Sequence, residues 1–452
     1  MVTRRTLLQA VVLAGLASGC NQGTPSGGGT TGATGRPTTN GSVITPGGSA
    51  TEVRLELARA PRAADPAAGA AMLGAFAGSL LGAALKKEQG NLILSPWSIT
   101  AALGMNRAGA AGRTAEQIDA AMHVPPSPAG FLDEVVNTGS QLLDARNETI
   151  RGVERSGEVA LRSANSTWAA RDITWKRPFL ETLARYYGSG VRLTDFAHDP
   201  EAARTQINAW VSERTKGRIP ELVPRDSVDR DTLIAVVNAL YFKAPWAKKF
   251  EETGTTTKDF TLADGTVKRV QMMHTLFEEA RSHTGDGWLG VTLPYLGAKL
   301  AFTAVLPAKG REAKVADWLV GGGITALLAD EGRALVDLTM PKFQYQTSLP
   351  LEEVMLGLGI KDAFDPGAAD YSGMTDDERI CITAALHQAT IAVDEEGTEA
   401  TAATAIIGGR GGAGGPVPVV VVLDRPFFLV IHDVQTRVPL FVGRVADPTV
   451  TS

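Results

Sequence analysis

The six histidines and two cysteines of the chain are its strongest candidates for acid–base, nucleophilic or metal chemistry. Their spacing matches neither an H-E-x-x-H zinc motif nor a Cys/His metal cluster, and no G-x-S-x-G, Walker or dinucleotide-binding glycine motif follows a predicted strand. A Ser-His-Asp triad assembled from distant positions stays open, because such triads are defined by geometry. The sequence therefore predicts a protein that is not an enzyme and needs no metal or other cofactor.

The two cysteines lie in different surroundings. Cys381, inside the apolar segment 380–382, is predicted to be a small core residue and not a nucleophile. The body of the protein then has no second cysteine with which to form a disulfide, so its stability must come from packing.

Residues 1–20 form an export signal, with a basic start, an apolar run from Leu7 to Ala17 and small residues before Cys20. The pair Arg4-Arg5 resembles a twin-arginine signal. The residues around Cys20 resemble a bacterial lipobox, in which the cysteine is lipidated and becomes the new N-terminus; the alternative is an ordinary cleavage site nearby. We expect an exported protein, anchored by a lipid at the cell surface or the periplasmic membrane face, or extracellular.

The composition divides the remaining chain into a tether and one domain. Residues 21–66 are rich in Gly, Thr, Ser and Pro, which predicts a flexible tether. Residues 67–452 form a single predicted domain without repeats, and a chain with 44% hydrophobic and 21% charged residues is ordinary globular protein. The net charge of −5 gives no sign of the excess positive charge that nucleic-acid binding requires. We expect a monomeric, soluble body.

Helical periodicity dominates the first half of this domain, and strand-like runs dominate the second. Helices are predicted over residues 71–85, 98–122 and 203–219. The nearly all-apolar run 233–242 predicts a strand buried on both faces. Helices first and strands later predict an α+β fold, with a large mixed or antiparallel sheet covered by helices. Further strands are predicted at 300–306, 335–340, 417–423, 427–432 and 440–445.

The stretch 393–415, VDEEGTEATAATAIIGGRGGAGG, passes from a strand-like end through small residues into glycine. One arginine is too little charge for an RGG-type nucleic-acid segment. An ordinary surface loop does not explain why residues 398–405 are small and free of proline. A segment that can later join a sheet as a central strand does explain it, because such a strand needs every backbone N–H. Alternation along an extended chain would place Thr398, Ala400, Ala402 and Thr404 inward, and Glu399, Thr401, Ala403 and Ala405 toward solvent.

Five segments, in family order, resemble the serpins, a family of loop-inserting protease inhibitors. The resemblance spans roughly residues 67–448 and implies about nine helices packed on three β-sheets, with an exposed reactive-centre loop. The five segments are NLILSPWSI at 91–99, VNALYFKAPW at 237–246, MPKF at 340–343, DEEGTEA at 394–400, and RPFF through PLFVGRV at 425–445.

The resemblance also implies a suicide-type mechanism and a serine protease as partner. The protease attacks the loop, and the freed hinge inserts into the main sheet while still carrying the acylated protease. Two alternatives remain: a non-inhibitory serpin acting as a surface binding or scaffold protein, and an exported hydrolase with an unrecognised active site.

Individual residues acquire roles through the same resemblance. Two residues of the shutter, which would control sheet opening, have a simpler alternative: His387 and Asn238 would then be satisfied buried polar groups. The hinge is implied at Glu395, Gly397, Thr398, Ala400, Ala402 and Ala403, the shutter at Ser95, Ser98, Asn238 and His387, and the breach at Trp246.

The cleaved bond is predicted to be Arg410–Gly411. The family's usual loop length, counted from Glu395, places Gly411 before the bond, and a loop shorter by one places Arg410 there. Arg410 offers a charge to the pocket of a trypsin-like protease. The alternatives are Gly411–Gly412 and a bond near Ile407, which would suit elastase- or subtilisin-like proteases.

Overall fold

The computed structural model describes residues 38–40, 43–46, 51–62, 67–126, 129–151, 160–329, 332–376, 380–398 and 417–450. Six of the predicted site residues lie outside these ranges. They are Cys20, Ala400, Ala402, Ala403, Arg410 and Gly411.

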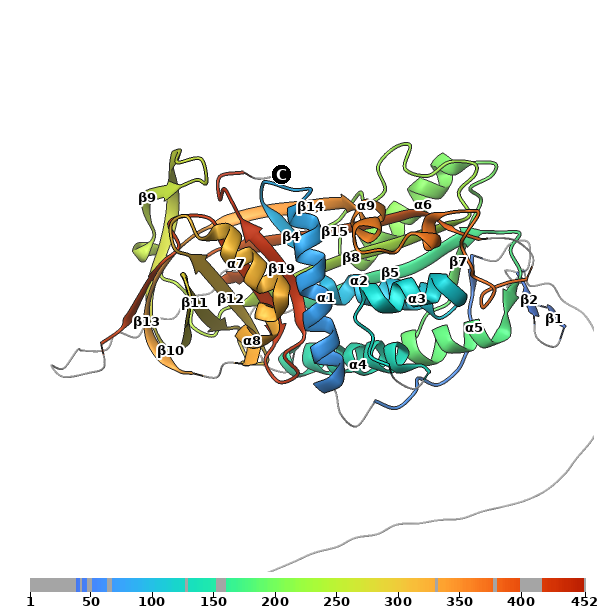
Figure 1. Cartoon of the computed structure of the whole chain (residues 1–452), viewed down its shortest axis with the longest axis horizontal. Coiled ribbons are helices and arrows are strands. Elements are labelled where there is room, and N and C mark those ends of the chain that lie inside the picture. The colour runs from blue at the N-terminus through green and yellow to red at the C-terminus, as the bar shows by residue number, and fades with distance from the viewer. Residues whose placement is uncertain are drawn as a thin grey trace, which may run out of the picture.

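Helices cover the two large sheets of the described residues (Figure 1). The predicted helical stretch 98–122 is two helices, because the chain leaves the helical path after Arg107 and Ala111, extended at φ −132° and ψ 172°, precedes the second helix. The helices are α1 (Ala67–Leu85), α2 (Pro96–Arg107), α3 (Gly112–Ala121), α4 (Phe131–Arg151), α5 (Arg177–Thr182), α6 (Pro200–Arg214), α7 (Glu312–Trp318), α8 (Ile324–Ala329) and α9 (Leu351–Gly357), with shorter turns η1 (Leu183–Tyr187), η2 (Glu252–Gly254), η3 (Leu319–Gly323) and η4 (Asp362–Phe364).

One sheet has seven strands and contains the predicted buried strand. Its order is β14 (Phe343–Pro350), β15 (Ile382–Val393), β16 (Gly397–Thr398), β8 (Ile234–Pro245), β5 (Ala160–Ala170), β7 (Val191–Thr194) and β3 (Glu52–Val53). The strand predicted at 233–242 is β8, and every residue of it is buried. This confirms that the strand is covered on both faces.

The second sheet has nine strands, and a third has three. The larger runs β17 (Val419–Val422), β13 (Ala334–Pro341), β10 (Val267–Gly285), β11 (Trp288–Pro294), β12 (Leu300–Pro307), β18 (Phe427–Asp433), β19 (Pro439–Val445) and β4 (Leu92–Leu94), with β9 (Thr256–Thr261) paired to β10. The smaller joins β1 (Thr38–Asn40), β2 (Val43–Thr45) and β6 (Trp175–Lys176). The predicted α+β fold is confirmed.

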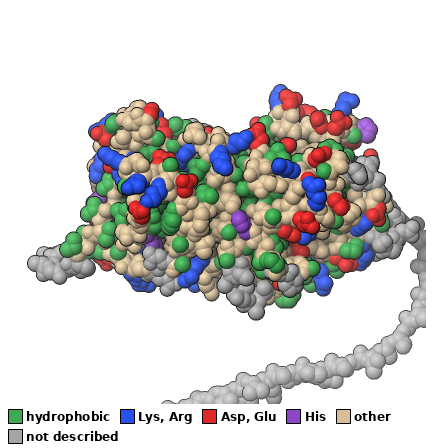
Figure 2. Space-filling model, in the orientation of Figure 1, with side chains coloured by type: hydrophobic (Ala, Val, Ile, Leu, Met, Phe, Trp, Pro, Cys, Tyr) green, Lys and Arg blue, Asp and Glu red, His purple; other side chains and the backbone are tan. Residues whose placement is uncertain are grey.

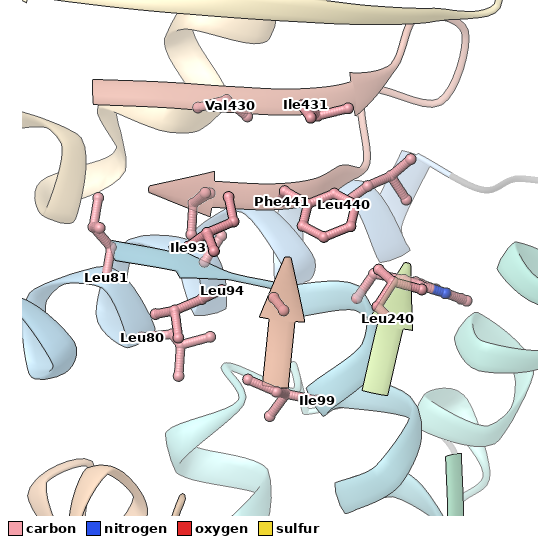
Figure 3. Close-up of a cluster of buried hydrophobic side chains, with 14 of the residues drawn as sticks. Leu80, Leu81, Ile93, Leu94, Ile99, Leu240, Val430, Ile431, Leu440 and Phe441 are labelled. Atoms are coloured by element: carbon pink, nitrogen blue, oxygen red, sulfur yellow. The ribbon is translucent and has the colours of Figure 1, made fainter. Parts of the chain in front are cut away.

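The main core lies between the two large sheets. Leu240 of β8 packs in the same buried cluster as Ile99 of α2 and Phe441 of β19 (Figure 3). α2 therefore lies beneath the inner face of β8. This position brings the N-terminal end of α2, with Ser95 as its cap, close to the middle of the seven-stranded sheet.

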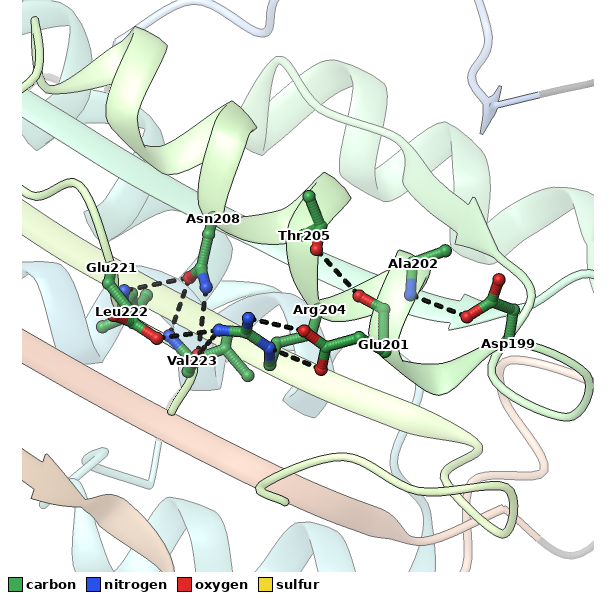
Figure 4. Close-up of polar contacts among 9 residues, drawn as sticks. All are labelled: Asp199, Glu201, Ala202, Arg204, Thr205, Asn208, Glu221, Leu222 and Val223. Atoms are coloured by element: carbon green, nitrogen blue, oxygen red, sulfur yellow. Dashed lines mark hydrogen bonds and ion pairs between the residues drawn. The ribbon is translucent and has the colours of Figure 1, made fainter. Parts of the chain in front are cut away.

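A second cluster covers the outer face of the same sheet. Ile207 and Val211 of α6 pack with Val237 and Ala239 of β8. Polar contacts fix the chain that follows α6, because the side chain of Asn208 accepts hydrogen bonds from the N–H groups of residues 222 and 223 (Figure 4). β8 is thus enclosed by α2 on one side and α6 on the other.

The predicted tether is wrong for residues 43–46 and 51–62, which are attached to the domain. β2 pairs with β6, and β3 adds a strand beside β7. Ile44 and Val53 are buried, and Arg59 donates to the side chain of Asn137 at 2.9 Å. The segment looked too poor in apolar residues to order, but backbone pairing with a sheet edge requires little side-chain hydrophobicity.

On the face shown in Figure 2, no large area carries charges of a single sign, because Lys and Arg are interspersed with Asp and Glu. Among the helices of the described residues, none combines the length and apolar composition needed to cross a bilayer.

Candidate functional site

The hinge segment re-enters the seven-stranded sheet immediately after β15 ends. A tight turn returns the chain, with the carboxylate of Asp394 accepting the N–H groups of Glu396 and Gly397. The chain then forms β16, in which Thr398 pairs with Val393 of β15 on one side and with β8 on the other. Gly397 and Thr398 therefore already occupy the place of a central strand.

Close packing explains the glycine at position 397. A Cβ there would lie 2.2 Å from the carbonyl oxygen of Ala244 and 2.5 Å from Cα of Pro245. Real side chains do not approach backbone atoms so closely, so any other residue would push the hinge away from β8. The implied hinge glycine thus has a direct steric reason.

Thr398 is fully buried above a pair of stacked aromatic rings. Its hydroxyl lies 2.6 Å from the hydroxyl of Tyr295, and burial raises the pKa of this tyrosine. The ring of Tyr295 stacks on Trp246, with centroids 4.8 Å apart. Trp246 in turn donates from its indole N–H to the carbonyl of Asp394 at 2.9 Å. The breach residue therefore holds the hinge turn directly.

Two lysines neutralise the acidic start of the hinge. The carboxylate of Glu395 accepts from Lys342 at 2.6 Å and from the hydroxyl of Thr255 at 2.6 Å, and Glu396 pairs with Lys249. Burial opposes ionisation of Glu395, but the hydrogen bonds from Lys342 and Thr255 outweigh it and hold the pKa of that carboxyl below its usual range. The hinge is anchored in its charged form.

Below the hinge, the sheet is closed by direct parallel pairing of β8 with β15. His387 lies opposite Asn238 in this ladder, and both side chains are fully buried. The Nε2 atom of His387 accepts from the N–H of Ser95 at 3.2 Å, so its proton must lie on Nδ1, which donates to the side-chain oxygen of Asn238. Burial lowers the pKa of His387 to about 3, which keeps the ring neutral.

The polar cluster continues from Asn238 into α2 and β5. The side-chain amide of Asn238 donates to Ser98 and to Asn165, each at 2.8 Å. The hydroxyl of Ser95 caps α2 by accepting the N–H of Ser98 and donates to the carbonyl of Leu440 in β19. One cluster thus ties together four strands and one helix at the point where the sheet would have to open.

The structure brings the described site residues together in two groups. Ser95, Ser98, Asn238 and His387 form the lower polar cluster. Above it, Trp246 donates to the carbonyls of Asp394 and Glu396, in the turn that leads to the paired hinge residues Gly397 and Thr398. The alternative interpretation, satisfied buried polar groups, also fits His387 and Asn238, because both are hydrogen-bonded.

Sequence reasoning missed several partners of these residues. Asn165 faces Asn238 only because of the β5–β8 register, which leaves no local sequence signal. Tyr295 is similarly brought in by a long-range contact. Lys342 lay within the matched MPKF segment, so its position near the hinge could have been suspected from that segment alone.

Two other expectations concern reactive groups. Cys381 is buried as predicted, and burial raises the pKa of its thiol. Among the described residues, no three His, Cys, Asp or Glu side chains gather as a metal site.

Comparison with known proteins identifies the class to which this fold and hinge belong. The family model for serpins, serine protease inhibitors, matches residues 71–448. Iris from Ixodes ricinus is 34% identical over 367 residues, covering 80% of this chain and 93% of Iris. Serpin B9 from Homo sapiens is 31% identical over 363 residues, covering 79% of this chain and 93% of the relative.

Solved structures agree with this family. The native state of tengpin, a thermophilic serpin, matches with a TM-score of 0.75 and 25% identity, covering 88% of this chain and all of tengpin. Native protease nexin-1 with heparin matches with a TM-score of 0.71 and 26% identity, covering 85% of this chain. The protein belongs to the serpin family, a family described as serine protease inhibitors.

The neutral, buried state of His387 predicts a pH dependence of stability. The unfolded ring titrates near 6.5, whereas the native ring stays neutral to about 3. The unfolded state therefore binds more protons between these values, and acidification from pH 6.5 to 5 should lower the free energy of unfolding by about 2 kcal/mol. Denaturant unfolding at both pH values measures this, and His387→Gln should flatten the dependence.

A second buried histidine provides the matched comparison. Burial lowers the pKa of His432 to about 3 as well, so His432→Gln should remove a separate share of the dependence. An unchanged pH dependence in His387→Gln, with the variant folded, would contradict the neutral shutter histidine.

Proposed function

We propose that this serpin is a suicide-type inhibitor of serine proteases that traps the acyl-enzyme by inserting its cleaved loop between β15 and β8. The single observation that carries the proposal is the pairing of Gly397 and Thr398 within the sheet. The hinge starts between the two strands that must separate, so insertion would extend a strand that has already begun.

The register of β16 defines the path of the inserted loop. Thr398 lies opposite Ala244, so each further loop residue would advance one position back along β8. On this path Ala400 would lie at Phe242, and Ala402 at Leu240. The same positions follow from β15, because Leu240 and Ala389 are already opposite each other. Small side chains suit positions 400 and 402, because packed core residues would lie directly beneath the inserted strand.

The outer face of the slot gives a reason for small residues there too. In the same register, Ala403 would lie beside Ala239 and Ala405 beside Val237, two residues that pack against α6. Alternation alone predicts solvent on this side, but α6 covers it. Large side chains at these two loop positions would press against α6, so alanine is suited to both.

Insertion is energetically plausible as the driving step. About ten new ladder hydrogen bonds, at roughly 0.5–1.5 kcal/mol each, contribute on the order of 10 kcal/mol. This is comparable to the whole stability of a typical domain. The uncleaved protein would then be a kinetically held state.

The proposed target class is a trypsin-like protease. Arg410 supplies a positive charge for the specificity pocket, and Arg410–Gly411 is the proposed scissile bond. The glycines around Arg410 add conformational freedom that would help the loop fit a protease cleft. The proposed partner is captured as a covalent acyl complex with one inhibitor monomer.

Mixing the purified protein with trypsin tests the proposal. We expect an SDS-resistant covalent complex and a released C-terminal peptide that begins at Gly411, identified by mass spectrometry. Loop cleavage with a protease that is not retained should raise the thermal unfolding temperature, because the new strand adds to the sheet. Cleavage without complex and without thermal stabilisation would contradict inhibition and favour a binding or scaffold role.

Substitution at the buried hinge position separates insertion from cleavage. Thr398→Arg would place a charge over the aromatic pair, where it cannot be hydrated, and should delay insertion. We expect cleavage by trypsin to continue while the trapped fraction falls about tenfold or more, since the charge would displace position 398 from its place in β16 and would have to be desolvated before the strand could extend. Thr398→Ser keeps the hydroxyl and should trap almost normally. Equal trapping by both variants would count against the register.

We also propose that the protein is exported and anchored by a lipid on Cys20. The supporting observation is the leader sequence of residues 1–20. Expressed in a bacterial host, the protein should partition into detergent, and Cys20→Ala should move it to the aqueous phase. Equal partitioning of both proteins would rule out the anchor.

A further inference from the structure

The strand that follows the reactive loop exposes an unusual number of apolar side chains. Val417 is 89% exposed, Val420 60% and Val422 37%, and Leu276 on the neighbouring β10 is 39% exposed. We call these four residues the β17 patch. Single exposed apolar residues are normal on a protein surface, but several gathered at one place commonly mark an interaction site.

Strand register places three of these side chains on one face of the sheet. Asp337 of β13 lies opposite Leu276 on one side and Val420 on the other. The alternate residue of β17, Val421, is fully buried on the opposite face. Leu276, Val420 and Val422 therefore lie on one face of the sheet, on the two strands that flank β13.

A polar pair lies among these side chains. His274 and Asp337 are 2.6 Å apart, and both side chains are partly exposed. Thr339, between His274 and Val422 in the register, is buried on the same face. Protein–protein interfaces combine apolar contacts with about one hydrogen bond per 100–200 Å², so this pair can supply polar contacts beside the apolar ones.

The position of the patch relates it to the proposed scissile bond. Val417 is only six positions after Gly411, so even a fully extended chain would span at most about 21 Å between them. A protease domain of roughly 200 residues is about 40 Å across. A protease bound at Arg410–Gly411 must therefore lie close to β17, at the end of the molecule that β10 and β13 form in Figure 1.

We infer that the β17 patch is a second contact surface for the target protease, engaging an apolar area beside its active-site cleft on the side that holds the residues after the scissile bond. The inference rests on the proposed inhibitory function. The patch would increase the rate at which the protease engages the loop and would contribute nothing to insertion, because β17 belongs to the nine-stranded sheet and insertion occurs in the other.

A second copy of this chain fits the patch less well. Pairing along the free edge of β17 would need a long strand with available N–H groups, but β17 has four residues and directly follows Pro418, which has no N–H. The face of the strand, in contrast, remains open to a globular partner. The observations therefore favour the protease.

The test compares loop cleavage rates under second-order conditions with trypsin as the probe. The variant Leu276→Thr/Val420→Thr places β-branched threonine, which favours strands, at both positions and removes apolar surface. Val267→Thr is the control, since Val267 is 55% exposed on β10 but lies outside the patch. A synthetic peptide of residues 398–416 reports cleavage of the loop without the patch.

We expect the double variant to be cleaved about tenfold more slowly than the wild-type protein, a change that corresponds to losing roughly two buried methyl groups. The trapped fraction and the thermal unfolding temperature should stay unchanged, and the control variant should match the wild type. An unchanged cleavage rate in the double variant would overturn the inference. So would a wild-type dimer, seen by sedimentation, that the double variant converts to monomer.

The readout separates this inference from the proposed function. Cleavage rate is measurable whether or not the acyl-enzyme is retained, so a protein that is cleaved but never traps trypsin refutes inhibition while still testing the patch. Normal trapping with identical rates in wild type and double variant refutes the patch alone.

Discussion

The direct pairing of β8 with β15 is the constraint on which the rest of the structure depends. These strands run parallel and bond to each other from Ile382 to Thr390 of β15. Above this ladder they are separated by β16, which is antiparallel to both. The same sheet thus contains a closed lower half and an upper end that already accepts a strand. A parallel ladder is slightly weaker per residue than an antiparallel one, so replacing it with two antiparallel ladders favours the inserted arrangement.

The two groups of site residues act on opposite ends of this arrangement. The upper group holds the hinge in place through Trp246, Tyr295 and Lys342, whereas the lower group resists opening through the His387–Asn238 contact. Separating β8 from β15 would break that contact and leave buried polar atoms without partners, which is costly. In the proposed register, Thr404 would arrive between the two side chains. Its hydroxyl can donate and accept, which explains why a polar residue follows the alanines at this inward position.

Sequence reasoning predicted the architecture well where the signal was local. The apolar run of β8 and the order of helices and strands could be read directly, and the serpin resemblance supplied the hinge and shutter positions. The long-range contacts could not be read. Asn165 reaches its partners through strand register, and Tyr295 through an isolated bridge, and neither has a local pattern. The attachment of residues 43–46 and 51–62 was missed because edge pairing depends on an available backbone, not on composition.

That attachment changes how an anchored protein would present its loop. β1 and β2 lie at one end of the molecule, and β10 and β13 lie at the other (Figure 1). A chain free up to residue 66 would let the domain tumble in every orientation. With β2 and β3 fixed to the domain, the proposed membrane anchor pulls on one end only. The β17 patch, which adjoins β13, would then lie at the end of the domain opposite the proposed anchor, where a soluble protease would have access to it.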